Sequence, residues 1–310
     1  MKDDYYSVHR RYKEVIVVRV VYVCKDNIIS YQSIHSSHFI KKKERIQNNK
    51  KNTRIYTMLE VFFAATPNGW KVSIALEELK AAGCDIDWKV VNVNLATDMF
   101  TDWYMEVSPN SKMPAIRDDG FTMFESGAIL HYLADKFPGV LLPKDPHKKW
   151  TALSWLHWQM ANVGPMFGNR LTYIRYLPEA GEVHPHPQER FGKEARRLAE
   201  VLDRQLEGQD YICGEFSIVD ISVYPWLRGW KWSKVDLTGE RLGNGTKRLD
   251  NVLKWIDRVR AREGVSNGLR WGFEGKEDEI DKWSEERRNS YKKSGGNIAV
   301  THGVDKAAKL

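Results

Sequence analysis

Residues 59–79 read LEVFFAATPNGWKVSIALEEL. The first six residues are apolar except for Glu60, and their aromatic and β-branched side chains are typical of a strand. Thr66-Pro67-Asn68-Gly69 then forms a turn, and Pro67 fits the first turn of a helix because its missing N–H has no intrahelical partner there. Apolar residues recur at three- and four-residue steps up to Leu79. The stretch therefore predicts a strand joined to a helix by a short turn.

The elements that follow complete a small α/β domain over residues 58–137. Ala82-Gly83 ends the first helix, since glycine adopts the left-handed backbone that commonly closes helices. We predict a second strand at 86–93, a short helix at 98–107, a strand pair at 113–116 and 121–123, and a helix at 125–137. The order is strand, helix, strand, helix, strand, strand, helix, which predicts one compact α/β unit.

A linker at residues 138–146, rich in proline and glycine, separates this unit from a helical region. Apolar residues at helical spacing run through residues 147–268, with a last helix predicted at 247–262. Ser217-Ile218-Val219-Asp220 resembles a capping box, in which the serine side chain accepts from the N–H three residues on. Residues 269–310 are highly charged, and we predict that they form a loose C-terminal tail.

The formal net charge of +7 is unevenly distributed along the chain. Residues 1–57 carry 13 Lys+Arg and 5 Asp+Glu, so residues 58–310 carry the remaining 35 and 36 and are near neutral. A block of like charge without a hydrophobic period is typical of a solvated tail rather than a binding groove. We therefore expect no nucleic-acid binding. Residues 1–57 are predicted to be a basic extension, disordered or not native to the protein, and the functional domain to start near Met58.

Cys24, Cys84 and Cys213 are few, odd in number and far apart. Their spacing predicts neither a disulfide framework nor a metal site. No apolar run approaches the roughly 20 residues of a membrane span, so no membrane association is expected. These features favour a reducing compartment, the cytoplasm. The last three residues, Ala308-Lys309-Leu310, resemble the peroxisomal tripeptide S-K-L, which leaves import into peroxisomes as an alternative.

Four strings in this order resemble the glutathione transferase superfamily: ATPNGWKVSIALEEL, SPNSKMPAI, FESGAILHYLADKF and FSIVDISVYPW, at residues 65–79, 108–116, 124–137 and 216–226. The resemblance covers about residues 58–268 and is closest to the nu-class and fungal prion-regulator-like branch, which includes bacterial glutathione-dependent disulfide-bond oxidoreductases. It implies a thioredoxin-like α/β domain followed by an all-α domain. It also implies a two-fold homodimer, and glutathione as co-substrate without a metal.

Glu125 and Ser126 stand where the resemblance places the γ-glutamyl end of glutathione. A carboxylate suits the ligand's ammonium group, and a hydroxyl with free N–H groups at a positive helix end suits its carboxylate. Taken alone, the pair can equally be an ordinary helix cap. The MPAI string eleven residues upstream favours the binding role.

Met113-Pro114 resembles the family's cis-proline turn, which would expose the backbone of Met113 to the cysteinyl unit of glutathione. A proline at a strand edge is the alternative. Thr66 and Asn68 begin the first helix, and both side chains can donate hydrogen bonds to a thiolate held at the helix N-terminus. A plain turn before a helix is the alternative for this pair.

Two further residues come from the resemblance. Arg197 matches an arginine that, in nu-like relatives, reaches into the site from the partner subunit, and a solvated helix face is the alternative. Met99 stands where relatives often have a glutamine that touches the ligand, so the sequence departs from the family pattern at this contact. Trp226, Trp230 and Trp232 are predicted to pack in the helical core, with the wall of a substrate pocket as the alternative.

The function implied is glutathione-dependent reduction of small disulfides or hydroperoxides, in which bound glutathione supplies the thiol. Two alternatives remain: a transferase that conjugates glutathione to electrophiles, and a non-catalytic regulator or scaffold with this fold. Neither Cys84, at the far end of the first helix, nor Cys213, in a loop, is placed to become an acidic thiol. The predicted catalytic residues are Thr66 and Asn68, and the predicted glutathione ligands are Met99, Met113, Pro114, Glu125, Ser126 and Arg197.

Overall fold

The structure is a computed structural model that describes residues 22–24, 27–29, 58–179, 181–240 and 246–273. The chain divides into two compact units, Met1–Tyr56 and Thr57–Leu310. In the first unit, β1 (Tyr22–Cys24) pairs antiparallel with β2 (Asn27–Ile29). The rest of the predicted extension lies outside the described residues. So does the chain from residue 274 on, including most of the predicted tail and its Ala308-Lys309-Leu310 tripeptide.

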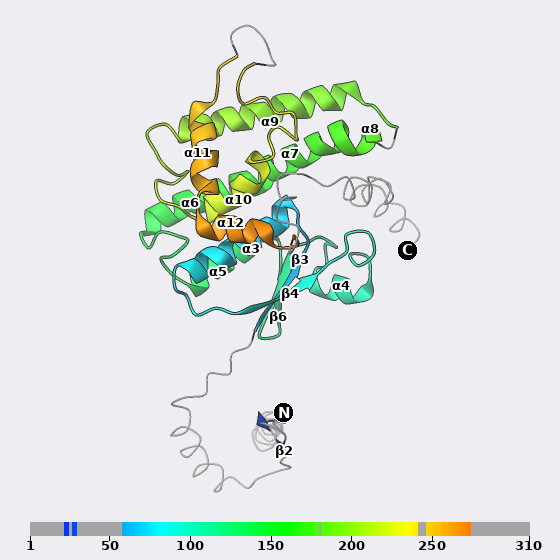
Figure 1. Cartoon of the computed structure of the whole chain (residues 1–310), viewed down its shortest axis with the longest axis vertical. Coiled ribbons are helices and arrows are strands. Elements are labelled where there is room, and N and C mark those ends of the chain that lie inside the picture. The colour runs from blue at the N-terminus through cyan, green and yellow to red at the C-terminus, as the bar shows by residue number, and fades with distance from the viewer. Residues whose placement is uncertain (1–21, 25–26, 30–57, 180, 241–245, 274–310) are drawn as a thin grey trace, which may run out of the picture. The chain divides into compact units, whose positions relative to one another are not determined.

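The second unit contains a four-stranded sheet in the order β4-β3-β5-β6, in the lower part of that unit in Figure 1. The strands are β3 (Leu59–Phe63), β4 (Trp88–Asn92), β5 (Ala115–Asp118) and β6 (Phe121–Phe124). β4 runs parallel to β3, whereas β5 and β6 are antiparallel to their neighbours. Asp119 and Gly120 turn the β5–β6 hairpin with φ angles of 50° and 81°, because Asp-Gly tolerates the positive φ of a tight hairpin turn. The predicted element order is confirmed.

Three helices complete the α/β half: α3 (Pro67–Ala81), α4 (Asp102–Val107) and α5 (Ser126–Lys136). Gly69 is required where α3 leaves the sheet, because a Cβ atom there would lie 2.1 Å from the carbonyl oxygen of Ala64. α4 begins four residues later than predicted. The Asp98 carboxylate accepts from the N–H of Asn94 and the Thr101 hydroxyl donates to the carbonyl of Asp98, so this segment is a turn.

The second half of this unit is helical, and its helices gather above the sheet in Figure 1. A long helical segment over residues 146–179 is interrupted by two short π-helical turns, η1 and η2. The remaining helices follow as separate elements. Their bounds are α6 (Pro146–Trp158), η1 (Gln159–Val163), α7 (Gly164–Leu171), η2 (Thr172–Tyr176), α8 (Leu177–Glu179), α9 (Pro185–Gln205), α10 (Ile218–Leu227), α11 (Asp250–Arg260) and α12 (Glu263–Arg270).

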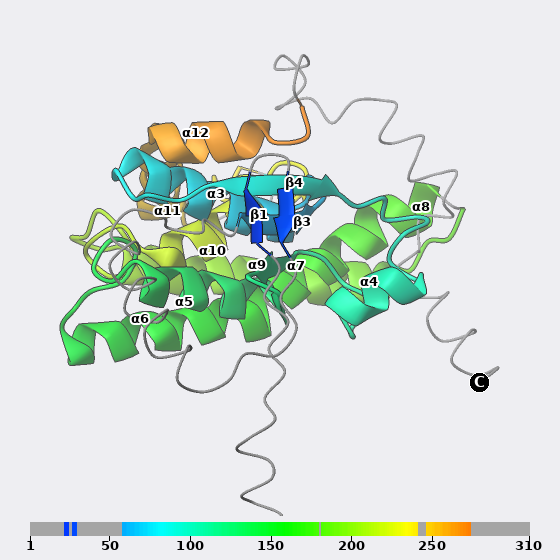
Figure 2. The ribbon, with the colours of Figure 1, turned by 90° about the horizontal axis from the view of Figure 1, so that it is seen from below.

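The helix predicted over residues 247–262 is confirmed as α11, but the prediction that it is the last helix is wrong. A further helix, α12, follows it and lies along α3 in both Figure 1 and Figure 2. Gly268 permits this close packing, because a Cβ atom there would lie 2.6 Å from the backbone of Ile74. The predicted domain end at residue 268 therefore falls inside α12. Beyond it, Trp271 contacts the Phe63 ring at 5.6 Å between centroids, so the C-terminal segment packs onto the α/β half.

The two halves share one hydrophobic core, to which α10 contributes from the helical side. The predicted capping box at its start is confirmed. The Asp220 carboxylate accepts from the backbone N–H of Ser217 at 3.0 Å, and the Ser217 hydroxyl accepts from backbone N–H groups in the first turn of the helix. Asp220 is fully buried and also accepts from the indole N–H of Trp255 at 2.8 Å. Burial raises the pKa of Asp220 to about 6, while the hydrogen bonds oppose that rise. This network fixes the start of α10 against α11.

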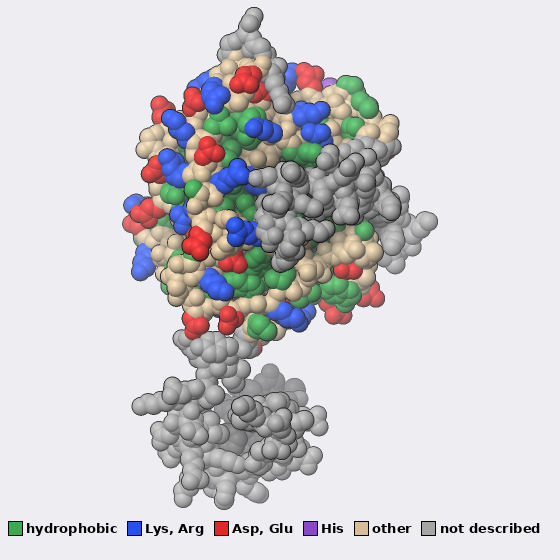
Figure 3. Space-filling view, viewed as in Figure 1, with side chains coloured by type: hydrophobic (Ala, Val, Ile, Leu, Met, Phe, Trp, Pro, Cys, Tyr) green, Lys and Arg blue, Asp and Glu red, His purple; other side chains and the backbone are tan. Residues whose placement is uncertain are grey.

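The described surface is mixed in charge. On the face shown in Figure 3, basic and acidic side chains are interspersed, in agreement with the near-neutral composition of residues 58–310. Among the helices that the structure describes, none combines the length and apolar character needed to cross a membrane.

Candidate active site

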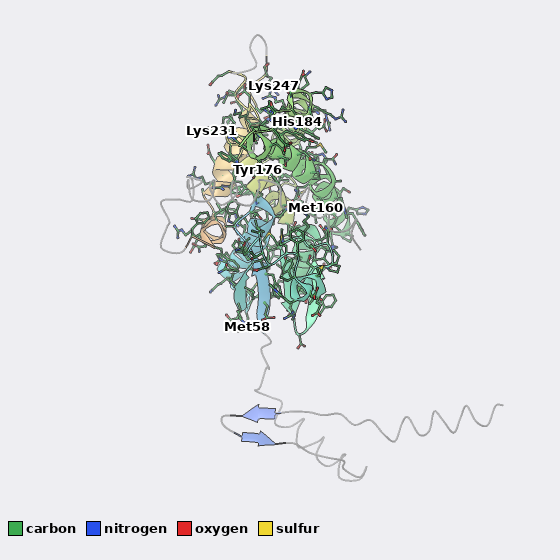
Figure 4. All side chains as sticks on the ribbon, turned by 90° about the vertical axis from the view of Figure 1, so that its right-hand side faces the viewer. Met58, Met160, Tyr176, His184, Lys231 and Lys247 are labelled. Carbon is green, nitrogen blue, oxygen red and sulfur yellow. The ribbon has the colours of Figure 1, made fainter. Side chains whose placement is uncertain are left out.

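A cavity of about 1190 Å³ opens where the start of α3 faces the helical half. Thr66, Asn68, Met99 and Met113 line it from the α/β side. Aromatic and basic side chains line it from η2, from the end of α10 and from the segment that follows α10. They include Tyr176, Trp226, Arg228, Trp230, Lys231 and Trp232. Figure 4 labels Tyr176 and Lys231 in the helical half and Met58 at the opposite end of the unit. The volume suits a peptide-sized ligand with room for a second reactant.

Thr66 is the N-cap of α3, and its hydroxyl makes two hydrogen bonds. It accepts from the N–H of Gly69 at 3.2 Å and donates to the sulfur of Met113 at 3.2 Å. A thioether is a weak acceptor. The Thr66 hydroxyl can therefore give up this hydrogen bond and donate to a stronger acceptor instead. The helix N-terminus adds positive electrostatic potential at the same place. Thr66 can therefore cap the helix and also donate to a thiolate, and the two roles do not exclude each other.

The peptide bond between Met113 and Pro114 is cis, as the sequence predicts. This turn brings Met113 to the cavity wall beside Thr66, although the two residues lie 47 positions apart in the chain. Met99 is buried and also lines the cavity. It packs with Met113, Phe62 and Tyr104 in a small apolar cluster, where its thioether offers a ligand little more than van der Waals contact.

Glu125 and Ser126 form the start of α5. Glu125 is exposed and has a φ of 71°. A positive φ is uncommon for a residue with a side chain, and such residues cluster at functional sites. Ser126 is the first residue of the helix and is buried. Neither residue lines the large cavity, so the two predicted parts of the site are distinct: a thiol end at Thr66 and a helix-start end at Ser126.

A residue that the sequence analysis missed, Lys71, lies on α3 and contacts the helix-start end of the site. Its side chain is buried within α3, and its ammonium group donates to the Ser126 hydroxyl at 3.2 Å and to the Gln159 side-chain oxygen at 2.8 Å. Burial lowers the pKa of Lys71 to about 7, although the nearby Glu125 carboxylate opposes this shift. One signal was present in the sequence: Lys71 is a charge between Trp70 and Val72 in a helix that is otherwise apolar over this stretch.

Arg197 lies apart from Thr66 and Ser126 in its own subunit. It is on α9, where its guanidinium donates to both carboxylate oxygens of Glu194 at 2.6 and 2.8 Å. The Arg197 side chain is half exposed and lines a second cavity of about 640 Å³ with Met166 and His186. Within one chain, therefore, the structure does not bring Arg197 to the other predicted ligands.

Three tryptophans, one in the last turn of α10 and two after it, belong to the cavity wall, which the sequence analysis gave as the alternative. Trp226, Trp230 and Trp232 all line the cavity, and Trp226 and Trp230 also contact the core. Arg175 lies over the Trp232 ring at 4.2 Å from its centroid. The core prediction was incomplete because Trp226 and Trp230 are only partly buried and line the cavity as well as contacting the core.

The described cysteines are not part of this site. Cys84 follows the C-terminal end of α3, and Cys213 lies in the loop before α10. Burial raises the pKa of both thiols, to about 12 for Cys213, so neither is activated as a thiolate. Among the residues that the structure describes, no group of three or more His, Cys, Asp or Glu side chains could hold a metal ion.

Comparison with known proteins places this geometry in a family. The disulfide-bond oxidoreductase YfcG of Escherichia coli strain K12 is 34% identical over 221 residues, which are 68% of this chain and 94% of YfcG. YghU of the same organism is 36% identical over 219 residues, covering 68% of this chain and 73% of YghU. The family described as glutathione S-transferase, N-terminal domain matches residues 61–141. The chain belongs to the glutathione S-transferase superfamily.

Solved structures of the superfamily agree with this assignment. A glutathione transferase from Pseudomonas putida, with one glutathione disulfide bound per subunit, is 32% identical with a TM-score of 0.61 and covers 72% of this chain and 95% of its own. One from Burkholderia graminis, with two glutathione molecules bound per subunit, is 34% identical with a TM-score of 0.61 and covers 77% and 97%. The thioredoxin-like α/β domain followed by an all-α domain is thus confirmed.

Proposed function

We propose that this glutathione transferase is a glutathione-dependent disulfide-bond oxidoreductase that uses glutathione bound at the start of α3 as its nucleophile. Its similarity to YfcG and YghU, both named disulfide-bond oxidoreductases, supports this reaction class. The observation that carries the proposal is the Thr66 hydroxyl. It caps the α3 N-terminus, lines the cavity and donates to a thioether that a thiolate can readily replace.

The cysteinyl sulfur of glutathione would lie against Thr66 and Asn68, where two donors and the positive end of α3 favour its thiolate form. The thiolate attacks one sulfur of the disulfide substrate, the sulfur–sulfur bond breaks, and the departing thiolate takes a proton from solvent. A second glutathione thiolate then attacks the mixed disulfide. Glutathione disulfide and a second substrate thiol are released, so two glutathione molecules supply the two electrons.

The γ-glutamyl end of glutathione would lie at the start of α5. There the exposed Glu125 carboxylate pairs with the ammonium group, and the Ser126 hydroxyl and helix N–H groups hold the carboxylate. The backbone of Met113 at the cis turn would pair with the cysteinyl unit between the two ends. In this arrangement Met99 contributes contact area beside the ligand rather than a hydrogen bond.

A second function, conjugation of glutathione to electrophiles, is favoured by one feature of the cavity. Trp226, Trp230 and Trp232 form a wall that suits an apolar or aromatic acceptor. Hydroperoxide reduction uses the same bound thiolate. Assaying a small disulfide, an organic hydroperoxide and an aryl halide with glutathione separates these reactions. Faster turnover of the disulfide supports the proposal, whereas turnover of the aryl halide alone replaces it with the transferase.

The working form would be a homodimer. Phe121 is 58% exposed on β6 and contacts Tyr132 of α5, and Lys149 of α6 pairs with Asp135 of α5 at 2.6 Å. Elements β6, α5 and α6 are therefore neighbours, and their exposed apolar side chains suit a partner surface. Trp150, 69% exposed at the start of α6, is the largest of these side chains.

Arg197 would act from the partner subunit in this dimer. Mixing Arg197→Ala subunits with Ser126→Ala subunits tests the sharing, because each heterodimer would contain one site with both residues intact. Regained activity after mixing supports a shared site. Activity that stays at the average of the two variants shows that Arg197 serves no site across the interface.

A further inference from the structure

The buried Lys71 has a complete set of partners beneath the start of α5. An ammonium group has three N–H donors and no acceptor. Those of Lys71 point to the Ser126 hydroxyl at 3.2 Å, the Gln159 side-chain oxygen at 2.8 Å and the Met160 sulfur at 3.4 Å. Figure 4 shows Met160 at the level where the two halves of the unit meet. Lys71 is thus held between α3, α5 and η1.

These contacts determine which way the Ser126 hydroxyl can donate. Its oxygen accepts from Lys71, so its own proton must go to another acceptor. The acceptor in this structure is the Met160 sulfur at 3.8 Å, which is long and weak. A carboxylate arriving at the α5 N-terminus is a far better acceptor. Lys71 therefore leaves Ser126 ready to donate to an anion.

We propose that Lys71 is a positioning residue for the γ-glutamyl carboxylate of glutathione, orienting the Ser126 hydroxyl toward it and placing a buried positive charge behind the α5 N-terminus. This inference rests on the proposed function, because it assumes that glutathione binds at Ser126. Lys71 itself does not touch the ligand. It acts through Ser126 and through its charge.

The size of the charge effect follows from the geometry. A carboxylate oxygen one hydrogen bond beyond Ser126 would lie at most about 6 Å from the Lys71 nitrogen. At an effective dielectric constant of about 20, the attraction of two unit charges at that distance changes affinity by about 100-fold. Loss of the Lys71 charge should therefore weaken binding by roughly 10- to 100-fold, since part of the attraction is screened.

The same geometry predicts that glutathione binding is linked to a proton. Because the pKa of Lys71 is lowered to about 7, the ligand-free protein at neutral pH is a mixture of charged and neutral forms. An anion bound nearby favours the charged form and raises this pKa, so binding takes up a proton near and above pH 7. The affinity for glutathione is then highest below pH 7. It falls as the pH rises from the pKa of Lys71 in the ligand-free protein to the higher pKa of Lys71 in the complex.

Other charged groups near Lys71 do not mimic this behaviour. Glu125 at the start of α5 is the carboxylate that acts on Lys71. Glu78, further along α3, is paired with Arg262 at 2.7 Å, and Asp220 on α10 accepts from Trp255 and backbone N–H groups. His131, further along α5, lies 3.4 Å from Asp135. All the variants compared below retain His131, so any contribution of its imidazole cancels between them.

The first experiment uses the unaltered full chain. Titration calorimetry with S-methylglutathione, which has no thiol to ionise, is run at about pH 7.5 in two buffers of different ionisation enthalpy. The observed heat should depend on the buffer and report uptake of a fraction of a proton per ligand. Affinity should fall several-fold between about pH 6 and pH 8. Equal heats in the two buffers, with affinity constant over this range, would overturn the inference.

The second experiment assigns the proton to Lys71. Lys71→Met retains a long apolar stem and removes the charge, and Lys80→Met, on the exposed end of the same helix, is the matched control. Lys71→Met should bind S-methylglutathione roughly 10- to 100-fold more weakly at about pH 6 and take up no proton. Lys80→Met should match the unaltered chain. Proton uptake that persists in Lys71→Met would overturn the inference, and if Lys71→Met does not fold, Lys71→Gln, which also removes the charge, is measured in its place.

A third measurement separates this inference from the proposed function. An S-methylglutathione analogue that lacks the γ-glutamyl carboxylate should bind the unaltered chain weakly, and Lys71→Met should change its affinity by less than about threefold. If Ser126→Ala leaves S-methylglutathione binding unchanged, the proposed site is wrong. If Ser126→Ala weakens binding while Lys71→Met does not, the site stands and the role of Lys71 fails.

Discussion

Replacing Thr66 by valine removes its hydroxyl while keeping the shape of the side chain, and so separates two roles of this residue. The hydroxyl accepts from the Gly69 N–H at 3.2 Å and donates to the Met113 sulfur at 3.2 Å. Loss of an N-cap costs about 1 kcal/mol of stability, and the weak bond to sulfur adds little. For a folded unit of this size, that loss lowers the melting temperature by about 2–4 °C. The fold should therefore survive the change.

The effect on catalysis should be larger than the effect on stability. If the Thr66 hydroxyl stabilises the glutathione thiolate as strongly as a typical transition-state donor, Thr66→Val lowers the rate of disulfide reduction by about 10- to 1000-fold. Thr66→Ser keeps the hydroxyl and should lose much less. The assay is steady-state reduction of a small disulfide with glutathione, together with the ultraviolet absorbance of the bound thiolate as pH is varied.

Thr66→Val should also raise the pKa of the bound glutathione thiol, because one donor to the thiolate is gone. Thr66→Ser should leave that pKa close to its value in the unaltered protein. The reasoning is refuted if Thr66→Val shows the expected loss of melting temperature but keeps both its rate and its thiolate titration. Such a result would leave Thr66 as a helix cap alone.

Three further outcomes are expected. Ser126→Ala and Glu125→Ala should each weaken glutathione binding by roughly 10- to 150-fold, as measured by calorimetry, because each removes a partner of a charged ligand group; unchanged affinity in both would move the site elsewhere. Gly268→Val should destabilise the protein by about 1–3 kcal/mol or more in denaturant unfolding, since its Cβ would lie 2.6 Å from the α3 backbone; an unchanged free energy of unfolding would show that α12 does not pack on α3 in this way. Lys71 should make stability rise as pH increases from about 7 to about 10, because the unfolded chain still binds the proton that the folded chain has lost, and Lys71→Met should abolish that rise.

Much of the α/β half could be predicted from the sequence because its elements follow local rules. The strand and turn at 59–69 and the Asp119-Gly120 hairpin each have a residue pattern with one favoured backbone. The start of β5 was placed two residues early, since Pro114 has no N–H for the sheet. α12 was missed because its eight residues include two glycines and few apolar side chains, and it is stable only through its contact with α3.

Part of the candidate site could be expected from the resemblance, whereas the contacts that depend on packing could not. Thr66, Asn68 and Met113 meet at one cavity, as expected from strings far apart in the chain. Lys71 was missed because its role depends on Ser126 and Gln159, which lie 55 and 88 residues away. No local pattern encodes such a contact. The cavity-lining position of Trp232 likewise depends on how the segment after α10 packs.

The central claim is that the attacking thiol belongs to bound glutathione and not to the protein. Cys84 and Cys213 have pKa values raised by burial and lie away from Thr66, and Cys24 belongs to the separate N-terminal unit. The most direct test is the rate of glutathione-dependent disulfide reduction by a variant in which all three cysteines are replaced by serine or alanine. We predict that this cysteine-free protein keeps most of the activity and that adding Thr66→Val to it removes that activity. A cysteine-free protein that is folded, binds glutathione and does not reduce the disulfide would contradict the claim.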